Sequence, residues 1–430
     1  MSRQTCRAAL LAPLLCLAAL TARADEAGEF KKAWARAQDA DARHAALRRL
    51  GQAQTVDAAR LLARVALDGQ VEWPSREVAV EALCGISAPA VVLWAGDAVA
   101  GKEKDPLLRA VLCDYLGARA TADPQVASLL LRALDDEHTG VLAAAIRGLA
   151  RTRTPVTVDA LVRLLGRPTA AGRVRGDCLR ALRGLTGEAF GSPEEWRAWW
   201  AAAREGWTPP SGDAPPRPTA DDPGAHRTVT RLAAPVDAGR TIYGGVESRA
   251  VLFVVDFSYS MHVKVLAGDG TSPTRLDYVK EALVGAIEGQ LGDDHQFNII
   301  GFSSEVRPWK RKLTKANAAG KRDAVRWVRA LRPEGETNIH DALELAFQHP
   351  DVDTIYFLTD GMPNQGRTTI TDEILGAVRG WNAGRNVRVC AIAFLAGDAA
   401  AFNVVENKDM QVRWLRALAE QNGGTFTLFE

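Results

Sequence analysis

Five oxygen-bearing side chains, in three separated segments of the chain, have the types that could hold a metal ion. Asp256, Ser258 and Ser260 lie in VVDFSYSM, Thr337 lies in EGETNIHDAL, and Asp360 lies in FLTDGMPN. Two carboxylates and three hydroxyls are hard oxygen donors. They favour Mg²⁺, Mn²⁺ or Ca²⁺ over zinc, because zinc prefers imidazole and thiolate ligands. We therefore expect a divalent-cation site if the fold brings these segments together.

Both carboxylates follow short apolar runs, which indicate the elements that position them. Residues 251–255 precede Asp256, and residues 355–358 precede the Thr-Asp-Gly of the second segment. A short apolar run that stops at a carboxylate is typical of a buried parallel strand with a polar group at its carboxyl end. In open α/β sheets, ligand sites lie at this edge, where the strand order reverses.

The rest of the C-terminal half alternates between strand and helix patterns. Alternating strands and helices indicate βαβ units and a mostly parallel, doubly wound α/β sheet. Further strands are predicted at residues 297–302, 387–394 and 425–429, and helices at residues 276–291, 318–331, 339–347, 370–381 and 410–421.

The five-residue pattern closely resembles the metal-ion-dependent adhesion site (MIDAS) of von Willebrand factor A (VWA) domains, over roughly residues 249–430. In that family an Asp and two Ser from a first loop, a Thr from a second and an Asp after the fourth strand hold the ion. By resemblance, these are Asp256, Ser258, Ser260, Thr337 and Asp360. Each alone is a weak signal, but all five occur in the family's order, which implies a Rossmann-like VWA domain with a complete MIDAS.

The resemblance also implies a function. In the family, the ion keeps an open coordination position, which a Glu or Asp of a partner protein often fills. We expect Tyr259, His262, Asn338 and Gly361 to line the rim of the ligand site. Tyr259 stands where many family members have Gly. Gly361 begins a loop rich in turn formers, which is either a specificity loop or an ordinary turn. His262 and His340 are candidates for the rim or for ordinary surface positions.

Two other functions stay open beside this adhesive, non-enzymatic interpretation. A metal-dependent hydrolase would need a base placed to activate water. The chain has no HExxH, GxSxG, Walker A or GxGxxG motif, which argues against the common enzyme classes. A scaffold whose VWA domain has lost its ligand is the third possibility. The formal net charge of +1 over 430 residues gives no basic excess, so nucleic acid is not favoured as a partner.

The N-terminal half has a helical, repetitive pattern between residues 25 and 207. Its apolar anchors recur about every thirty to thirty-six residues, which is typical of a helical solenoid, and the pattern resembles HEAT-type repeats. This all-α domain is expected to serve either as a scaffold or as a second protein-binding surface. The anchors are Leu47, Leu83, Leu112, Ile146 and Leu179.

An aromatic cluster and a Pro-rich segment follow the repeats. Trp196, Trp199, Trp200 and Trp207 are expected to form a hydrophobic cap on the last repeat, with a carbohydrate or protein site as the alternative. Residues 208–230 are predicted to be a linker and residues 231–430 the VWA domain. The segment 226–245 is less clear and could add a strand to the sheet edge.

The cysteines do not indicate a disulfide framework. Cys84, Cys113 and Cys178 occupy equivalent repeat positions, and Cys390 lies in a predicted strand. Free Cys in such positions behaves as a small core hydrophobe. We therefore expect all four to be structural.

The first 24 residues have the order of a secretory signal peptide. Arg3 and Arg7 precede the apolar residues 8–22, and Ala22 and Ala24 supply small residues at alternating positions. No other stretch is long and apolar enough to span a bilayer. We expect an exported protein, periplasmic or extracellular, with an uncleaved N-terminal anchor as the alternative.

Signal cleavage is directly testable. We predict that the exported chain begins at Asp25, because Ala22-Arg23-Ala24 fits the small-residue rule for signal peptidase. Mass spectrometry of the exported protein measures its N-terminus. An exported chain that retained Met1 would contradict the prediction.

Overall fold

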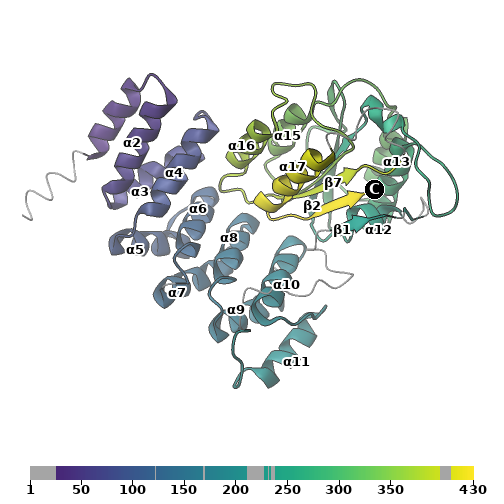
Figure 1. The fold of residues 1–430 in the computed structure, drawn as a ribbon. Coiled ribbons are helices and arrows are strands. Elements are labelled where there is room, and N and C mark those ends of the chain that lie inside the picture. The colour runs from purple at the N-terminus through teal and green to yellow at the C-terminus, as the bar shows by residue number, and fades with distance from the viewer. Residues whose placement is uncertain are drawn as a thin grey trace, which may run out of the picture.

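The computed structural model describes residues 26–121, 123–167, 170–210, 227–230, 232–233, 238–397 and 408–430. The predicted signal peptide and most of the predicted linker lie outside these residues. Within them, an array of paired helices is followed by an α/β domain whose sheet has helices on both faces (Figure 1). The predicted order, a helical-repeat domain and then a doubly wound domain, is confirmed.

The N-terminal array consists of short helices that share one continuous core. Side-chain caps define several of their starts, such as Asp39 before α2 and the Ser192–Glu195 capping box before α11. All five predicted anchors are buried in this core. After a first helix over residues 26–36, the elements are α2 (Ala40–Gln52), α3 (Val56–Leu67), α4 (Trp73–Gly85), α5 (Pro89–Asp97), η1 (Ala98–Lys102), α6 (Pro106–Gly117), α7 (Pro124–Arg132), η2 (Ala133–Asp135), α8 (Thr139–Leu149), α9 (Pro155–Leu165), α10 (Arg173–Thr186) and α11 (Pro193–Ala203).

The tryptophan cluster closes this core. Trp196 and Trp200 are buried in it, and Trp199 and Trp207 pack against it. The Trp200 Nε1 donates to Asp159 Oδ1 at 2.6 Å, which satisfies the buried indole. The cluster is therefore part of the hydrophobic core at the end of the array.

The sheet of the C-terminal domain has the strand order β1-β8-β7-β6-β2-β3-β4, and β5 pairs with β3. Among the strands of the described residues, β4 and β5 alone run antiparallel to their partner, β3. The chain passes from β2 to β3 on one side and from β6 to β7 on the other, so the strand order reverses between β2 and β6. The strands are β1 (Arg227–Val229), β2 (Ala250–Asp256), β3 (Gln296–Phe302), β4 (Val306–Pro308), β5 (Thr314–Lys315), β6 (Thr354–Thr359), β7 (Arg388–Phe394) and β8 (Phe426–Phe429).

Alternate residues of the strands face two separate helix layers, as period-2 side chains require. Phe253 of β2 belongs to the core beneath one layer, and Val254 belongs to the core beneath the other. The first layer comprises α12 (Ala238–Tyr243), α13 (Arg275–Gly289) and α14 (Ala318–Ala330), and the second comprises α15 (Ile339–Phe347), α16 (Thr371–Asn382) and α17 (Lys408–Gln421).

The edge strand that segment 226–245 was expected to offer is present, and it overlaps the end of the predicted linker. Arg227–Val229 were assigned to a linker over residues 208–230, but they form β1 and pair in parallel with β8. Three residues are too short to produce a readable strand pattern, so the sequence left this segment ambiguous. The sheet therefore begins before residue 231.

The four cysteines that were expected to be structural lie within the described residues. Cys84, Cys113, Cys178 and Cys390 are free there, and all but Cys84 are buried. Among the same residues, no single helix has the length and apolar content to span a bilayer. The α4 helix together with α5 and η1 meets that test only as a pair bent by 112°.

The helical array packs against the amino-terminal edge of the sheet. Trp73 of α4 packs against the glycines of α16, where a Cβ added at Gly376 would lie 2.2 Å from the Trp73 Cε2. Arg147 of α8 donates to Asn386 Oδ1 at 2.6 Å, just before β7. These contacts join segments more than two hundred residues apart, and they leave the carboxyl edge of the sheet uncovered by the array.

A buried ion-pair network reinforces this seam. Arg388, the first residue of β7, pairs with Asp177 of α10 at 2.7 Å, and Arg173 donates to the Asp353 carbonyl before β6 at 3.0 Å. Burial alone would raise the pKa of Asp177, but Arg388, Arg173 and Arg180 together hold it below its usual range. Removing one partner of such a network would leave an uncompensated buried charge.

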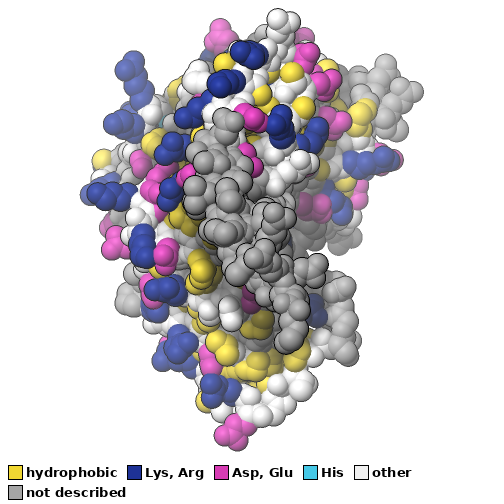
Figure 2. Space-filling view, turned by 90° about the vertical axis from the view of Figure 1, so that its left-hand side faces the viewer, with side chains coloured by type: hydrophobic (Ala, Val, Ile, Leu, Met, Phe, Trp, Pro, Cys, Tyr) yellow, Lys and Arg dark blue, Asp and Glu magenta, His cyan; other side chains and the backbone are white. Residues whose placement is uncertain are grey.

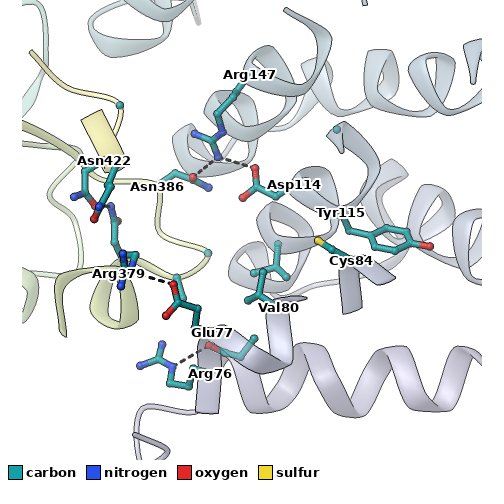
Figure 3. Close-up of a pocket in the computed structure, with 18 of the residues that line it drawn as sticks. Arg76, Glu77, Val80, Cys84, Asp114, Tyr115, Arg147, Arg379, Asn386 and Asn422 are labelled. Carbon is teal, nitrogen blue, oxygen red and sulfur yellow. Dashed lines mark hydrogen bonds and ion pairs between the residues drawn. The ribbon is translucent and has the colours of Figure 1, made fainter. Parts of the chain in front are cut away.

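A cleft of about 560 Å³ lies along the same seam (Figure 3). Arg147 of α8 bonds to Asp114 of α6 on the repeat side and to Asn386 across the cleft, and Arg379 pairs with Glu77 at 3.3 Å. Val80, Cys84 and Tyr115 form part of its lining on the repeat side. The predicted split into two domains hence coexists with an extensive packed contact between them.

The seam predicts an unusual response to glycine substitution. Gly376→Ala should destabilise the protein by about 1–3 kcal/mol, since the new methyl group would overpack Trp73. Gly184→Ala in α10 is the matched control. Nothing lies within 4 Å of its added Cβ, so it should be neutral or stabilise by up to about 1 kcal/mol through helix propensity. Thermal unfolding of both variants measures the difference. Equal shifts would contradict the packed seam.

Candidate metal centre

The two carboxylates lie at the ends of neighbouring strands. Asp256 is the last residue of β2, and Asp360 directly follows β6. The two strands pair in parallel with Val255 opposite Leu358, so their carboxyl ends are level. Both aspartates are buried. The strand order reverses at this point, where open α/β sheets form their ligand sites.

The loop after β2 connects the two aspartates through hydrogen bonds of Ser258 and Ser260. The Ser260 hydroxyl donates to Asp360 Oδ1 at 2.7 Å, and it lies 3.1 Å from the Ser258 hydroxyl. The backbone N–H of Ser258 donates to Asp256 Oδ1 at 2.7 Å. The loop turns through the short 3₁₀ segment Tyr259–His262, which brings both serines to the same side.

Thr337 reaches the same place from the loop before α15. Its hydroxyl lies 3.6 Å from a Cβ position built on Gly361, and the Ser260 hydroxyl lies 4.0 Å from that same point. The Asn364 side chain accepts from the Thr337 N–H at 2.6 Å, which ties this loop to the loop after β6. All five predicted residues therefore converge from three loops.

These loops surround a shallow pocket of about 400 Å³. Its wall includes Tyr259, Glu336 and Asn364, and its lining includes the hydroxyl-bearing residues Ser258, Ser260 and Thr337. Glu336 is exposed, and the Asn364 amide donates to its carboxylate. The pocket opens to solvent, so an exogenous ligand has a route to the hydroxyls.

Burial strongly perturbs the two carboxyl groups. Desolvation, followed by the charge of Asp360, raises the pKa of Asp256 from its ordinary value to about 7. Desolvation also raises the pKa of Asp360, although Arg275 and Ser260 oppose the change. Two buried carboxylates so close together favour either a proton or a cation between them. The donor chemistry, two carboxylates beside three hydroxyls, fits a hard divalent ion.

Two residues of this centre were not predicted from the sequence. Arg275, the first residue of α13, donates from Nη1 to Asp360 Oδ2 at 2.9 Å, and both side chains are buried. The Thr359 hydroxyl donates to Asp256 Oδ2 at 2.6 Å. A signal for Arg275 exists, because it falls on the apolar face of its helix with Val279 and Ala282, where an isolated basic residue needs a partner.

The predicted rim residues are only partly at the rim. Tyr259 is exposed, and its ring centroid lies 5.0 Å from that of exposed His262. Gly361 borders the Thr337 hydroxyl. Asn338, in contrast, is buried as the N-cap of α15, where its Oδ1 accepts from the Asp341 N–H. Helix capping turns its amide towards the helix.

His340 occupies neither of the positions expected for it. It is buried, its Nδ1 lies 2.9 Å from Asp341 Oδ1, and its ring makes an edge contact with Trp381. With Glu344 it forms a cluster whose ligand atoms lie within 4.8 Å of one another. Asn338 and Arg367 already engage the acidic members of the cluster. We therefore assign it a structural role in α15.

Comparison with known proteins agrees with the two halves of the fold. Residues 249–427 match the von Willebrand factor type A domain family, and residues 98–183 match HEAT repeats. The human von Willebrand factor A domain-containing protein 3A is 30% identical over 201 residues, which are 46% of this chain and 15% of that protein. The human protein 3B is 25% identical over 193 residues, 45% of this chain and 13% of that protein.

Two further similarities cover only the C-terminal half or less. The mouse inter-alpha-trypsin inhibitor heavy chain 4 is 34% identical over 136 residues, 29% of this chain and 13% of that protein. A solved von Willebrand factor type A structure from Catenulispora acidiphila is 16% identical, with a TM-score of 0.32, and covers 47% of this chain and 39% of that one. The chain thus spans a small part of the relatives it matches. Its C-terminal half is a VWA domain, and HEAT-like repeats precede it.

Proposed function

We propose that this is an exported, non-enzymatic binding protein whose VWA domain holds a divalent cation and, through it, an acidic group of a protein partner. Asp256, Ser258, Ser260, Thr337 and Asp360 would hold the ion, with Mg²⁺ as the first candidate and Mn²⁺ or Ca²⁺ as alternatives. The observation that carries the proposal is the convergence of three hydroxyl-bearing residues on one open pocket, with the buried Asp256 and Asp360 hydrogen-bonded to the loop that lines it. The bound ion would supply an electrophilic position for an incoming anionic oxygen.

Hydrogen bonds from neighbouring residues orient the proposed metal-binding carboxylates before any ligand binds. The Ser258 N–H and the Thr359 hydroxyl hold the two oxygens of Asp256, and the Ser260 hydroxyl holds one oxygen of Asp360. These bonds keep both carboxylates oriented, which lowers the ordering cost of binding. The serine and threonine hydroxyls add donors without adding charge.

Exposed apolar side chains support a protein rather than a small molecule as the partner. Tyr259 and Leu266 in the loop after β2, Ile370 before α16 and Met410 at the start of α17 are 49–74% exposed. All four lie on segments that follow the carboxyl ends of strands. Exposed apolar groups near a polar site are typical of protein-binding surfaces.

The helical repeats fit the role of a scaffold in this proposal. Their packed seam holds the amino edge of the sheet, and so the opposite edge stays available to a partner. Figure 2 shows the side of the N-terminal helices, where basic and acidic side chains are interspersed on the visible described surface. A second protein partner on the repeats is the alternative role.

A metal-dependent hydrolase is the alternative function for the site itself. Glu336, on the pocket wall, is the side chain that could act as a base. Turnover assays on phosphate and carboxylate esters, with Glu336→Gln beside the parent, separate the two functions. Hydrolysis by the parent that Glu336→Gln abolishes would favour the enzyme.

Asp256→Asn should remove the cation while keeping the fold. The asparagine Oδ1 can still accept a hydrogen bond in place of the carboxylate. Asp256→Ala, in contrast, would leave the Ser258 N–H and the Thr359 hydroxyl without their acceptor. We expect Mg²⁺ affinity to fall by more than about 100-fold, a larger loss than outer-shell changes typically cause. Calorimetric Mg²⁺ titration measures the change.

Three variants calibrate that titration. Ser258→Ala and Thr337→Ala should weaken Mg²⁺ less, because each removes a neutral donor. Asp293→Asn, an exposed position at the opposite edge of the sheet, should bind Mg²⁺ like the parent. If Asp256→Asn also bound Mg²⁺ like the parent, the assignment of the site would be wrong.

The pH dependence of stability provides an independent test. Because the folded-state pKa of Asp256 is raised to about 7, protonation stabilises the metal-free fold. This contribution is complete below the unfolded pKa of about 4 and is lost as the pH rises through about 7. In EDTA, the free energy of unfolding of the parent should therefore fall across this range relative to that of Asp256→Asn.

Other titrating groups contribute equally to the pH dependence of both proteins, so the comparison with Asp256→Asn removes their contribution. One such group is Asp353, because burial raises its pKa to about 6. Saturating Mg²⁺ should reduce the fall in the parent, since a cation favours the ionised carboxylate. If the free energy of unfolding had the same pH dependence for parent and variant in EDTA, the pKa of Asp256 would not be raised in the folded protein.

A further inference from the structure

Arg275 places a fixed positive charge directly beside the proposed cation site. Its side chain is 2% exposed. The guanidinium donates from Nη1 to Asp360 Oδ2 at 2.9 Å, from Nε to the Ala396 carbonyl at 2.8 Å, and from Nη2 to the Leu395 carbonyl at 3.1 Å. Arginine remains charged in proteins, so this charge is present whatever occupies the site.

The charges of the site do not balance with a cation alone. When both are ionised, Asp256 and Asp360 contribute two negative charges and Arg275 contributes one positive charge, which leaves a net charge of −1 among buried groups. A divalent cation would change this to +1. Uncompensated charge is costly where water is excluded. Glu336 lines the pocket but is exposed, so solvent screens its charge more effectively.

One further negative charge would neutralise the loaded site. We propose that Arg275 makes cation binding and carboxylate binding interdependent, so that the ion is held weakly alone and firmly when an acidic group of a ligand completes the site. This inference rests on the proposed function. It adds that the charge of Arg275 sets the coupling between the anionic ligand and the ion.

The coupling follows from thermodynamic linkage. If a carboxylate raises the affinity for the cation, the cation raises the affinity for the carboxylate by the same factor. Arg275 is therefore a positioning residue: it does not contact the ion, but its charge acts through Asp360, a proposed ligand of the ion to which it is hydrogen-bonded. If Arg275 were purely structural and only tied α13 to the loop after β7, the size of this coupling would not depend on its charge.

Calorimetric titration of Mg²⁺ into the full mature chain at pH 8, with and without saturating acetate, tests this directly. Acetate replaces chloride at constant ionic strength, and a titration into buffer corrects for Mg²⁺–acetate pairing. The parent should bind Mg²⁺ at least about 5-fold more tightly with acetate, the lower end of typical coupling between sites.

Two variants then assign the coupling to the charge of Arg275. Arg275→Gln removes the charge but keeps a donor for one carbonyl, and Arg275→Lys keeps the charge while losing the planar fork. Arg275→Gln should bind Mg²⁺ alone more tightly than the parent and lose most of the acetate effect. Arg275→Lys should behave like the parent. Circular dichroism and thermal unfolding check the fold of each variant.

The outcomes separate this inference from the proposed function. Equal Mg²⁺ affinity of the parent with and without acetate would overturn the inference and leave the cation site standing, a result that needs no variant. Equal effects of the Gln and Lys substitutions would overturn the role of charge. No Mg²⁺ binding by the parent under either condition would overturn the proposed function itself.

Discussion

The confinement of Asp256 and Asp360 at adjacent strand ends is the constraint on which the site depends. Parallel pairing of β2 and β6 makes their ends level, and the switch in strand order opens a crevice there. Two buried carboxylates in that crevice repel each other and resist ionisation. Hydroxyl donors and the single guanidinium of Arg275 stabilise them only in part. A divalent cation would offset the electrostatic repulsion that remains between the two carboxylates.

The helical repeats act on the opposite edge of the same sheet. Asp177 and Arg173 of α10 engage the start of β7 and the residue before β6, and Trp73 packs into the glycines of α16. The strands that carry the aspartates are therefore held at one end by the repeats and open at the other. This division explains how a large helical array can stabilise the domain without covering the site.

The strand ends and, through the family resemblance, the grouping of the five proposed ligands could be predicted from the sequence, but the contacts of Arg275 and of the seam could not. Apolar runs that stop at Asp256 and Asp360 identify strand ends, because a buried strand tolerates a carboxylate only where it leaves the core. Arg275 was missed because its partner lies 85 residues away. The seam was missed because Trp73 and Gly376 reveal their complementarity only once both helices are placed. Asn338 was misassigned because its capping role depends on where α15 begins.

The proposed function depends above all on a divalent cation between these strand ends. Anomalous diffraction from crystals grown with Mn²⁺ tests it most directly. We expect a strong peak within direct coordination distance, about 2.0–2.6 Å, of oxygen atoms of Asp256, Ser258 and Ser260. A peak at the His340, Asp341 and Glu344 cluster instead, or no peak at the ends of β2 and β6, would contradict it.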